Sequence, residues 1–222
     1  ILILPILLVL TQPDLGTSIL IAAGGIVVAW LAGVRIKFFA YSSLALLALL
    51  PVAISLLKPY QKSRILTFLN PERDPLGAGY QIIQSKIAIG SGGLFGKGFL
   101  NGSQSYLDYL PEKHTDFIFT LFSEEFGFFG SLSILLLYAL IISRIVKIGT
   151  LTRSTFGKLY CYSFATAFFI YVVVNMMMVL GLLPIVGSPL PIMSYGGSSM
   201  MAIMFGLGIV MSCKIHKDTP VN

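Results

Sequence analysis

The sequence predicts an all-α polytopic membrane protein. Of its 222 residues, 56% are hydrophobic and only 11% are charged, whereas a soluble domain usually has about 25% charged residues. The mean hydropathy is +0.88. Several uncharged runs also reach the length of about 20 residues that a helix needs to cross a bilayer. One core of this size cannot bury so much apolar surface, so we expect lipid to surround the chain.

In order along the chain, the uncharged runs predict about six membrane helices. The chain begins at Ile1 without Met, inside an apolar run, so Ile1 to Leu10 is interpreted as a truncated first helix, with upstream helices expected. The runs from Leu15 to Val34 and from Phe38 to Leu57 hold 20 residues each, and the run from Phe126 to Ser143 holds 18. These lengths suit single membrane spans.

The last two helices are expected within one uncharged run, the 55 residues from Leu159 to Cys213. Helix-breaking residues gather in its middle: Gly181, Pro184, Gly187, Pro189 and Pro191. Irregular backbone at membrane depth must be buried in protein or line a cavity. The run is therefore predicted to form a helix, an irregular apolar loop and a second helix.

Basic residues in the short connections predict the orientation, because Lys and Arg favour cytoplasmic loops. If the helices alternate, these residues fall on one side: Arg35, Lys37, Arg144, Lys147, Arg153, Lys158, Lys214 and Lys217. The extracytoplasmic side then carries the Thr11–Asp14 turn, the loop at 181–197 and one large polar loop at 58–115. We treat residues 1–222 as a single membrane domain that contains this large loop.

The net charge of +6 is explained by this topological bias. No basic block interleaved with aromatic residues is present, so nucleic acid is not an expected partner. Cys161 and Cys213 have no neighbouring Cys or His at ligand spacing, and we predict no metal site around them.

The large loop contains a glycine-rich stretch from Gly90 to Gly102, flanked by lysines. Such backbone can approach an anion closely, and Lys86 and Lys97 could bind a diphosphate as point charges. The spacing is not that of a P-loop. The alternative interpretation is a flexible surface turn.

Two aspartates stand at the start of apolar runs on the expected outer face. Asp116 directly precedes Phe117, and Asp14 precedes the second helix. Either one is a good helix N-cap. Asp116, beside Lys113 and His114 at a membrane boundary, is also a candidate general base.

Glu124 and Glu125 lie within the apolar run that follows Asp116, so we expect them inside the membrane region. They are eight and nine residues beyond Asp116, which corresponds to roughly 12–13 Å along a helix. Charged residues at such depth are usually functional or paired. A functional role and a structural ion pair both remain open.

The chain resembles the SEDS family, which contains the RodA, FtsW and SpoVE proteins, and is most similar to its RodA branch. The residues that carry the resemblance span nearly the whole chain: Gln12 to Thr17 (QPDLGT), Asn70-Pro71, Asp74 to Gln81 (DPLGAGYQ), Gln84 to Gly93 (QSKIAIGSGG), Gly96 to Gly98, Leu110 to Glu112, His114 to Phe119 (HTDFIF), Glu124-Glu125, Asn175, and Ser194 to Ser199 (SYGGSS). Two departures are Ser188, where an aliphatic residue is usual, and Asp108, where a glutamate is usual.

The resemblance implies a fold of ten membrane helices, of which this chain corresponds to the last six. It implies a peptidoglycan glycosyltransferase of the bacterial cytoplasmic membrane that polymerises lipid II on the outer face, in cell elongation and shape maintenance. It also implies a class B penicillin-binding protein as partner. The essential aspartate of the family corresponds to Asp116, and this fragment alone is expected to be inactive.

Within that mechanism Asp116 is the expected general base. Asp108, Glu112 and Asp14 are candidate supporting acids, and Lys86, Lys97 and Lys113 are candidates for stabilising the leaving diphosphate. A divalent cation shared by aspartates and diphosphate is possible, but no ligand spacing demands one. A lipid II flippase and a non-enzymatic scaffold for the penicillin-binding protein are the alternative functions.

Overall fold

The computed structural model describes residues 3–12, 14–56, 59–74, 77–103 and 114–218. Within these ranges all regular structure is helical, so the predicted all-α class is confirmed, while the number of about six membrane helices stays a prediction. The elements are α1 (Ile3–Thr11), α2 (Leu15–Leu31), α3 (Ile36–Leu56), α4 (Pro59–Leu69), the 3-10 turn η1 (Pro71–Arg73), α5 (Ala78–Ser91), α7 (Ile118–Leu151), α8 (Thr155–Val179) and α9 (Gly197–Ile215).

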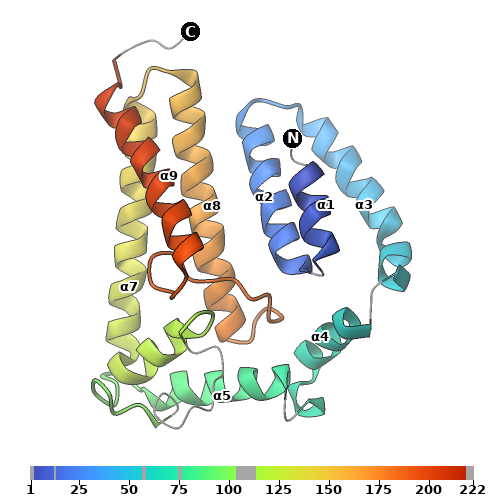
Figure 1. Ribbon diagram of the computed structural model, residues 1–222, viewed down its shortest axis with the longest axis vertical. Coiled ribbons are helices and arrows are strands. Elements are labelled where there is room, and N and C mark those ends of the chain that lie inside the picture. Colours follow the sequence, from blue (N-terminus) through green and yellow to red (C-terminus); the bar gives the residue numbers. More distant parts are fainter. Residues whose placement is uncertain (1–2, 13, 57–58, 75–76, 104–113, 219–222) are drawn as a thin grey trace.

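Three of the described helices, α7, α8 and α9, are long and apolar enough to cross a membrane. They form one group in Figure 1, and α2 packs against α8 on its other side. Large apolar side chains face outward along α7, such as Leu136 and Leu140, which are 57% and 59% exposed. This outward apolar surface is the one that lipid is expected to cover.

The core between α7, α8 and the loop before α9 is tightly packed. It is built from buried aromatic and aliphatic side chains: Phe117, Phe119, Tyr138, Phe168, Val172, Met176, Met178, Val179 and Leu190. The Tyr138 hydroxyl donates a hydrogen bond of 2.6 Å to the Pro191 carbonyl. This bond ties the irregular loop to the middle of α7.

The two ends of the helix group differ as the sequence predicts. The α2–α3 turn, the α7–α8 turn and the C-terminal end lie together at the upper end of Figure 1, and the Arg153 N–H bonds the Lys217 carbonyl at 3.0 Å. The α1–α2 turn, the loop at 181–196, α4 and α5 lie at the lower end. The basic connections are therefore grouped at one end of the protein.

The large polar loop is more ordered than its composition indicates. Its described part contains α4, η1 and α5, and α5 runs across the ends of α7 and α8 (Figure 1). Ser85 of α5 is buried and bonds the Val179 carbonyl and the Thr120 hydroxyl, each at 2.7 Å. These tertiary contacts seat α5 on the helix group.

The helix predicted from Phe126 to Ser143 has different limits. It extends from Ile118 to Leu151, and its backbone breaks at Gly127, where φ is +66° and ψ is −160°. Arg144 and Lys147, which were expected in the connection after this helix, lie within it and are exposed. The part before the break, Ile118 to Phe126, is a short helix of its own.

Candidate active site

Asp116 lies in the turn that leads into α7, and hydrogen bonds from other segments hold the backbone of this turn. The helix begins after Phe117, whose carbonyl accepts the N–H of Thr120 at 3.0 Å. The interpretation of Asp116 as the N-cap is therefore wrong by one residue.

Asn175 of α8 provides the first anchor. Its side chain is fully buried, and Nδ2 donates to the Asp116 carbonyl at 2.8 Å and to the Ser188 carbonyl at 2.7 Å. One amide group therefore joins the segment that carries Asp116 to the irregular loop before α9. A buried side-chain amide in an apolar helix is normally hydrogen-bonded, and here both bonds are donated by the Asn175 Nδ2 group.

The loop before α9 provides two more anchors. The Ser194 hydroxyl donates to the Thr115 carbonyl at 2.5 Å and accepts the Leu190 N–H at 2.7 Å. The Tyr195 N–H donates to the His114 carbonyl at 2.9 Å. Three consecutive carbonyls, those of residues 114, 115 and 116, are thus held by Asn175, Ser194 and Tyr195.

The Asp116 carboxylate is half-buried and faces the loop at 181–187. A methyl group added at Gly187 would lie 3.5 Å from Asp116 Oδ2. Gly187 has a φ of +74°, which L side chains rarely adopt. The loop therefore passes the carboxylate closely at a position that suits glycine.

Two cations border the same loop. The exposed Lys86 of α5 lies against Gly181, where an added methyl group would be 2.8 Å from Nζ. Arg64 of α4 donates from Nη1 to the Ile185 carbonyl at 3.4 Å. Spacing alone did not single out Arg64, because its contact is 121 residues away in sequence.

Asp14 caps α2, as one of the two interpretations predicted. Its Oδ1 accepts the Thr17 N–H at 3.0 Å, and its Oδ2 accepts the Thr17 hydroxyl at 2.6 Å. The next turn packs on the irregular loop, since a methyl group at Gly16 would overlap the Val186 side chain. Asp14 and Asp116 thus stand on segments that contact the same loop.

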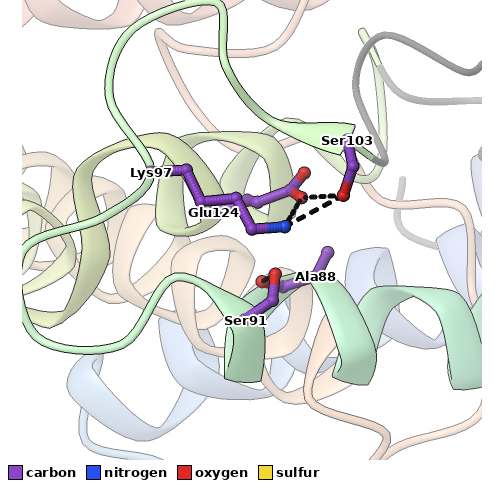
Figure 2. Close-up of polar contacts among 5 residues, drawn as sticks. All are labelled: Ala88, Ser91, Lys97, Ser103 and Glu124. Atoms are coloured by element: carbon purple, nitrogen blue, oxygen red, sulfur yellow. Dashed lines mark hydrogen bonds and ion pairs between the residues drawn. The ribbon is translucent and has the colours of Figure 1, made fainter.

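Lys97 is engaged by a carboxylate in the structure. Its Nζ lies 2.6 Å from Glu124 Oε1 and 2.9 Å from Ser103 Oγ, and the Ser103 hydroxyl donates to the same carboxylate oxygen at 3.1 Å (Figure 2). Glu124 is completely buried. The structural ion pair left open for Glu124 is therefore present, and binding of a diphosphate by Lys97 stays a prediction. The neighbouring Glu125, the second glutamate expected inside the membrane region, is also nearly buried, with 9% of its surface exposed.

The glycine-rich stretch packs against the break in α7. The N–H groups of Lys97 and Gly98 donate to the carbonyls of Glu124 and Glu125, both at 3.0 Å. These two donors are used within the protein, so the anion-cradle interpretation is wrong for them. The surface-turn alternative is confirmed in part, because Gly93 to Phe95 are exposed turn residues. Gly92 and Gly96, however, pack so closely on α7 that a methyl group at either would overlap its backbone atoms.

An apolar cavity of about 360 Å³ lies between α2, α8, α9 and the irregular loop before α9. Thr17, Tyr171 and Ser188 bring polar groups to its wall. The sequence predicted that the irregular loop at 181–197 is buried in protein or lines a cavity, and Ser188 to Pro191 of this loop do line it.

Three candidate residues, Asp108, Glu112 and Lys113, lie outside the described ranges. Among the described residues, no three His, Cys, Asp or Glu side chains are grouped to hold a metal ion. The cation that aspartates could share with a diphosphate is left open, because Asp108 lies outside the described residues.

Comparison with known proteins identifies the family. Residues 1–219 match the FtsW/RodA/SpoVE family, described as cell cycle protein. The peptidoglycan glycosyltransferase MrdB of Escherichia coli K12 is 50% identical over 215 residues, which are 96% of this chain and 58% of MrdB. The stage V sporulation protein E of Bacillus subtilis is 40% identical over 206 residues, which are 93% of this chain and 56% of that protein. The chain thus spans somewhat more than half the length of these relatives.

Solved structures agree with the sequence match. One chain comes from work on the structural coordination of polymerization and crosslinking by a peptidoglycan synthase complex. It superposes with a TM-score of 0.77 at 38% identity, covering 96% of this chain and 59% of that one. A crystal structure of a mutant of the rod shape determining protein RodA from Thermus thermophilus gives 0.62 at 28% identity, with 96% and 54% covered. This chain belongs to the FtsW/RodA/SpoVE family of cell cycle proteins, the SEDS family that its motifs indicate.

Proposed function

We propose that this chain forms the reactive part of a peptidoglycan polymerase that uses lipid II, with Asp116 as the general base. One observation carries the proposal: the backbone of residues 114–116 is held at three successive carbonyls by Asn175, Ser194 and Tyr195. A base must be held in a fixed place to act on a bound hydroxyl. Relatives at 40–50% identity, among them MrdB, carry the name peptidoglycan glycosyltransferase.

The chemistry requires one base and one stabilised leaving group. The oxygen of an acceptor sugar hydroxyl forms a bond to the anomeric carbon of the donor, and its proton passes to the Asp116 carboxylate. The bond from that carbon to the phosphate oxygen breaks, and its electron pair leaves with the lipid diphosphate. This single displacement inverts the anomeric centre.

The leaving diphosphate gains negative charge, which nearby cations stabilise. Lys86 and Arg64 border the loop that Asp116 faces. We assign them to this role ahead of Lys97, because the Lys97 ammonium is 2.6 Å from the buried Glu124 carboxylate. Asp14 lies on the segment across the same loop, where it supports the site as a second acid.

We place the protein in the bacterial cytoplasmic membrane with the Asp116 end outside. The basic connections gather at the opposite end of the helices, as expected for a cytoplasmic face. We propose a role in elongation and cell shape, with a class B penicillin-binding protein as partner. The structural relative from a peptidoglycan synthase complex supports such a partner.

The experiment uses full-length protein, because the relatives are longer than this chain. The protein is purified with its penicillin-binding protein and given labelled lipid II, and products are separated by size. Long glycan strands are the expected result. Absence of polymer together with transfer of lipid II across vesicle membranes would contradict the proposal and favour transport. Absence of both activities would favour a scaffold.

A further inference from the structure

We infer that the ion pair between Lys97 and the buried Glu124 is a positioning device for Asp116. The inference rests on the proposed function, since it concerns how the base of that reaction is held. Glu124 is fully buried and Lys97 partly exposed, and neither needs to touch a substrate. Their effect on the reaction passes through the short helix from Ile118 to Phe126.

This short helix is separated from the rest of α7. At Gly127 the backbone has a φ of +66° and a ψ of −160°, so no continuous helical ladder fixes its direction relative to residues 128–151. Asp116 stands just before its first turn, and Glu124 lies in its last turn. The short helix therefore acts as a lever with the proposed base at one end and the ion pair at the other.

The glycine-rich stretch supplies the backbone contacts that the break removes. The N–H groups of Phe128 and Phe129 donate to the carbonyls of Gly93 and Leu94, at 2.9 and 3.2 Å. Before the break, the carbonyls of Glu124 and Glu125 accept from the stretch instead. The stretch thus bridges both sides of the break.

The side chain of Glu124 makes further contacts with the glycine-rich stretch and with Ser103. Its Oε1 contacts Lys97 Nζ at 2.6 Å and Ser103 Oγ at 3.1 Å (Figure 2). Its Oε2 lies 2.9 Å from where a methyl group would stand at Gly102. A buried carboxylate needs such partners, and here they come from a segment 21 to 27 residues earlier.

The lever arm gives the size of the effect. Eight residues of helix span about 12 Å, so a tilt of about 5° about the Glu124 end displaces the Asp116 end by about 1 Å, against the three backbone bonds that hold residues 114–116. A misplacement of that size costs on the order of 100-fold in rate. Loss of the ion pair is therefore expected to lower kcat strongly while leaving KM nearly unchanged.

The test uses full-length protein in the lipid II assay with four variants. Lys97→Met is expected to lower kcat by about 100-fold with KM within about twofold, whereas Lys97→Arg, which keeps the charge, stays within about threefold of wild-type kcat. The double variant Lys97→Met with Glu124→Gln removes both charges of the pair and leaves neither one unpaired, so it is expected to keep the wild-type melting temperature and still lose at least about tenfold in kcat. Lys158→Met, an exposed cation at the opposite end, is the matched control.

The possible outcomes separate the positioning role of the ion pair from the proposed function. Wild-type kcat in folded Lys97→Met, or in the double variant, overturns the inference. Should these variants not fold, Glu124→Asp decides, because it keeps the charge and shortens its reach: a lower kcat supports the inference and an unchanged kcat overturns it. If wild type and Lys158→Met both make no polymer, the proposed function fails rather than the positioning role.

Discussion

Replacement of Asn175 by alanine tests the anchoring of the candidate base. The change removes the Nδ2 group that donates to the Asp116 carbonyl at 2.8 Å and to the Ser188 carbonyl at 2.7 Å. Both carbonyls then lose a donor inside the protein. Because Asn175 is fully buried, water does not readily replace the lost bonds.

The magnitude follows from counting the groups left without a partner. A buried acceptor without a donor costs about 1–3 kcal/mol, so two of them cost about 2–6 kcal/mol. Asn175 Oδ1 is itself buried without a partner in the described structure, and its removal offsets about 1 kcal/mol. The net destabilisation is therefore about 1–5 kcal/mol.

The assay measures thermal unfolding in detergent and lipid II polymerisation for the same preparation. Because Asp116 is then held less firmly, the kcat of the Asn175→Ala variant is expected to be about 10- to 100-fold lower than that of wild type. The matched control is Ser163→Ala on the same helix, because the Ser163 hydroxyl is buried without a partner in the described structure and its loss costs little. Wild-type stability and kcat in folded Asn175→Ala would refute the anchoring argument.

Three further changes probe the local geometry. Gly127→Ala is expected to destabilise the protein by about 1–3 kcal/mol, because the backbone conformation of Gly127 is essentially restricted to glycine and the methyl group would overlap Gly96. The control Gly24→Ala, in an open helical position, is expected to stabilise slightly. Equal melting temperatures of the two variants would contradict the strain assigned to Gly127. Tyr138→Phe removes the bond to Pro191 and is expected to cost about 1–3 kcal/mol, measured by thermal unfolding. Asp14→Ala removes the cap of α2 and is expected to cost about 0.5–2 kcal/mol; no shift in the midpoint would show that the cap contributes nothing.

The apolar helices were predictable because the bilayer imposes a length and a composition on each span. The cap at Asp14 was predictable too, since its partner Thr17 is three residues away. The N-cap prediction for Asp116 failed because the entry turn extends one residue further, to Phe117. Local patterns locate helices well and their first residues less well.

Long-range contacts were not predictable from one sequence. The glycine-rich stretch has the composition of a flexible turn, and only the break at Gly127 reveals why glycine is needed at Gly92 and Gly96. The helices α4 and α5 were missed because their sequences are polar and follow no membrane-span pattern; packing of residues such as Ser85 against α7 and α8 supports them. The pairing of Lys97 with Glu124 joins residues 27 positions apart.

The role of Asp116 as the base is tested most directly by its isosteric amide. Full-length Asp116→Asn, folded and assembled with its penicillin-binding protein, is compared with wild type and with Glu72→Gln, an exposed acid on η1. Loss of a general base typically costs about 10²–10⁴-fold. The account predicts a fall of that size in the initial rate of lipid II polymerisation for Asp116→Asn alone. Equal rates in all three proteins would contradict the assignment of Asp116 as the base.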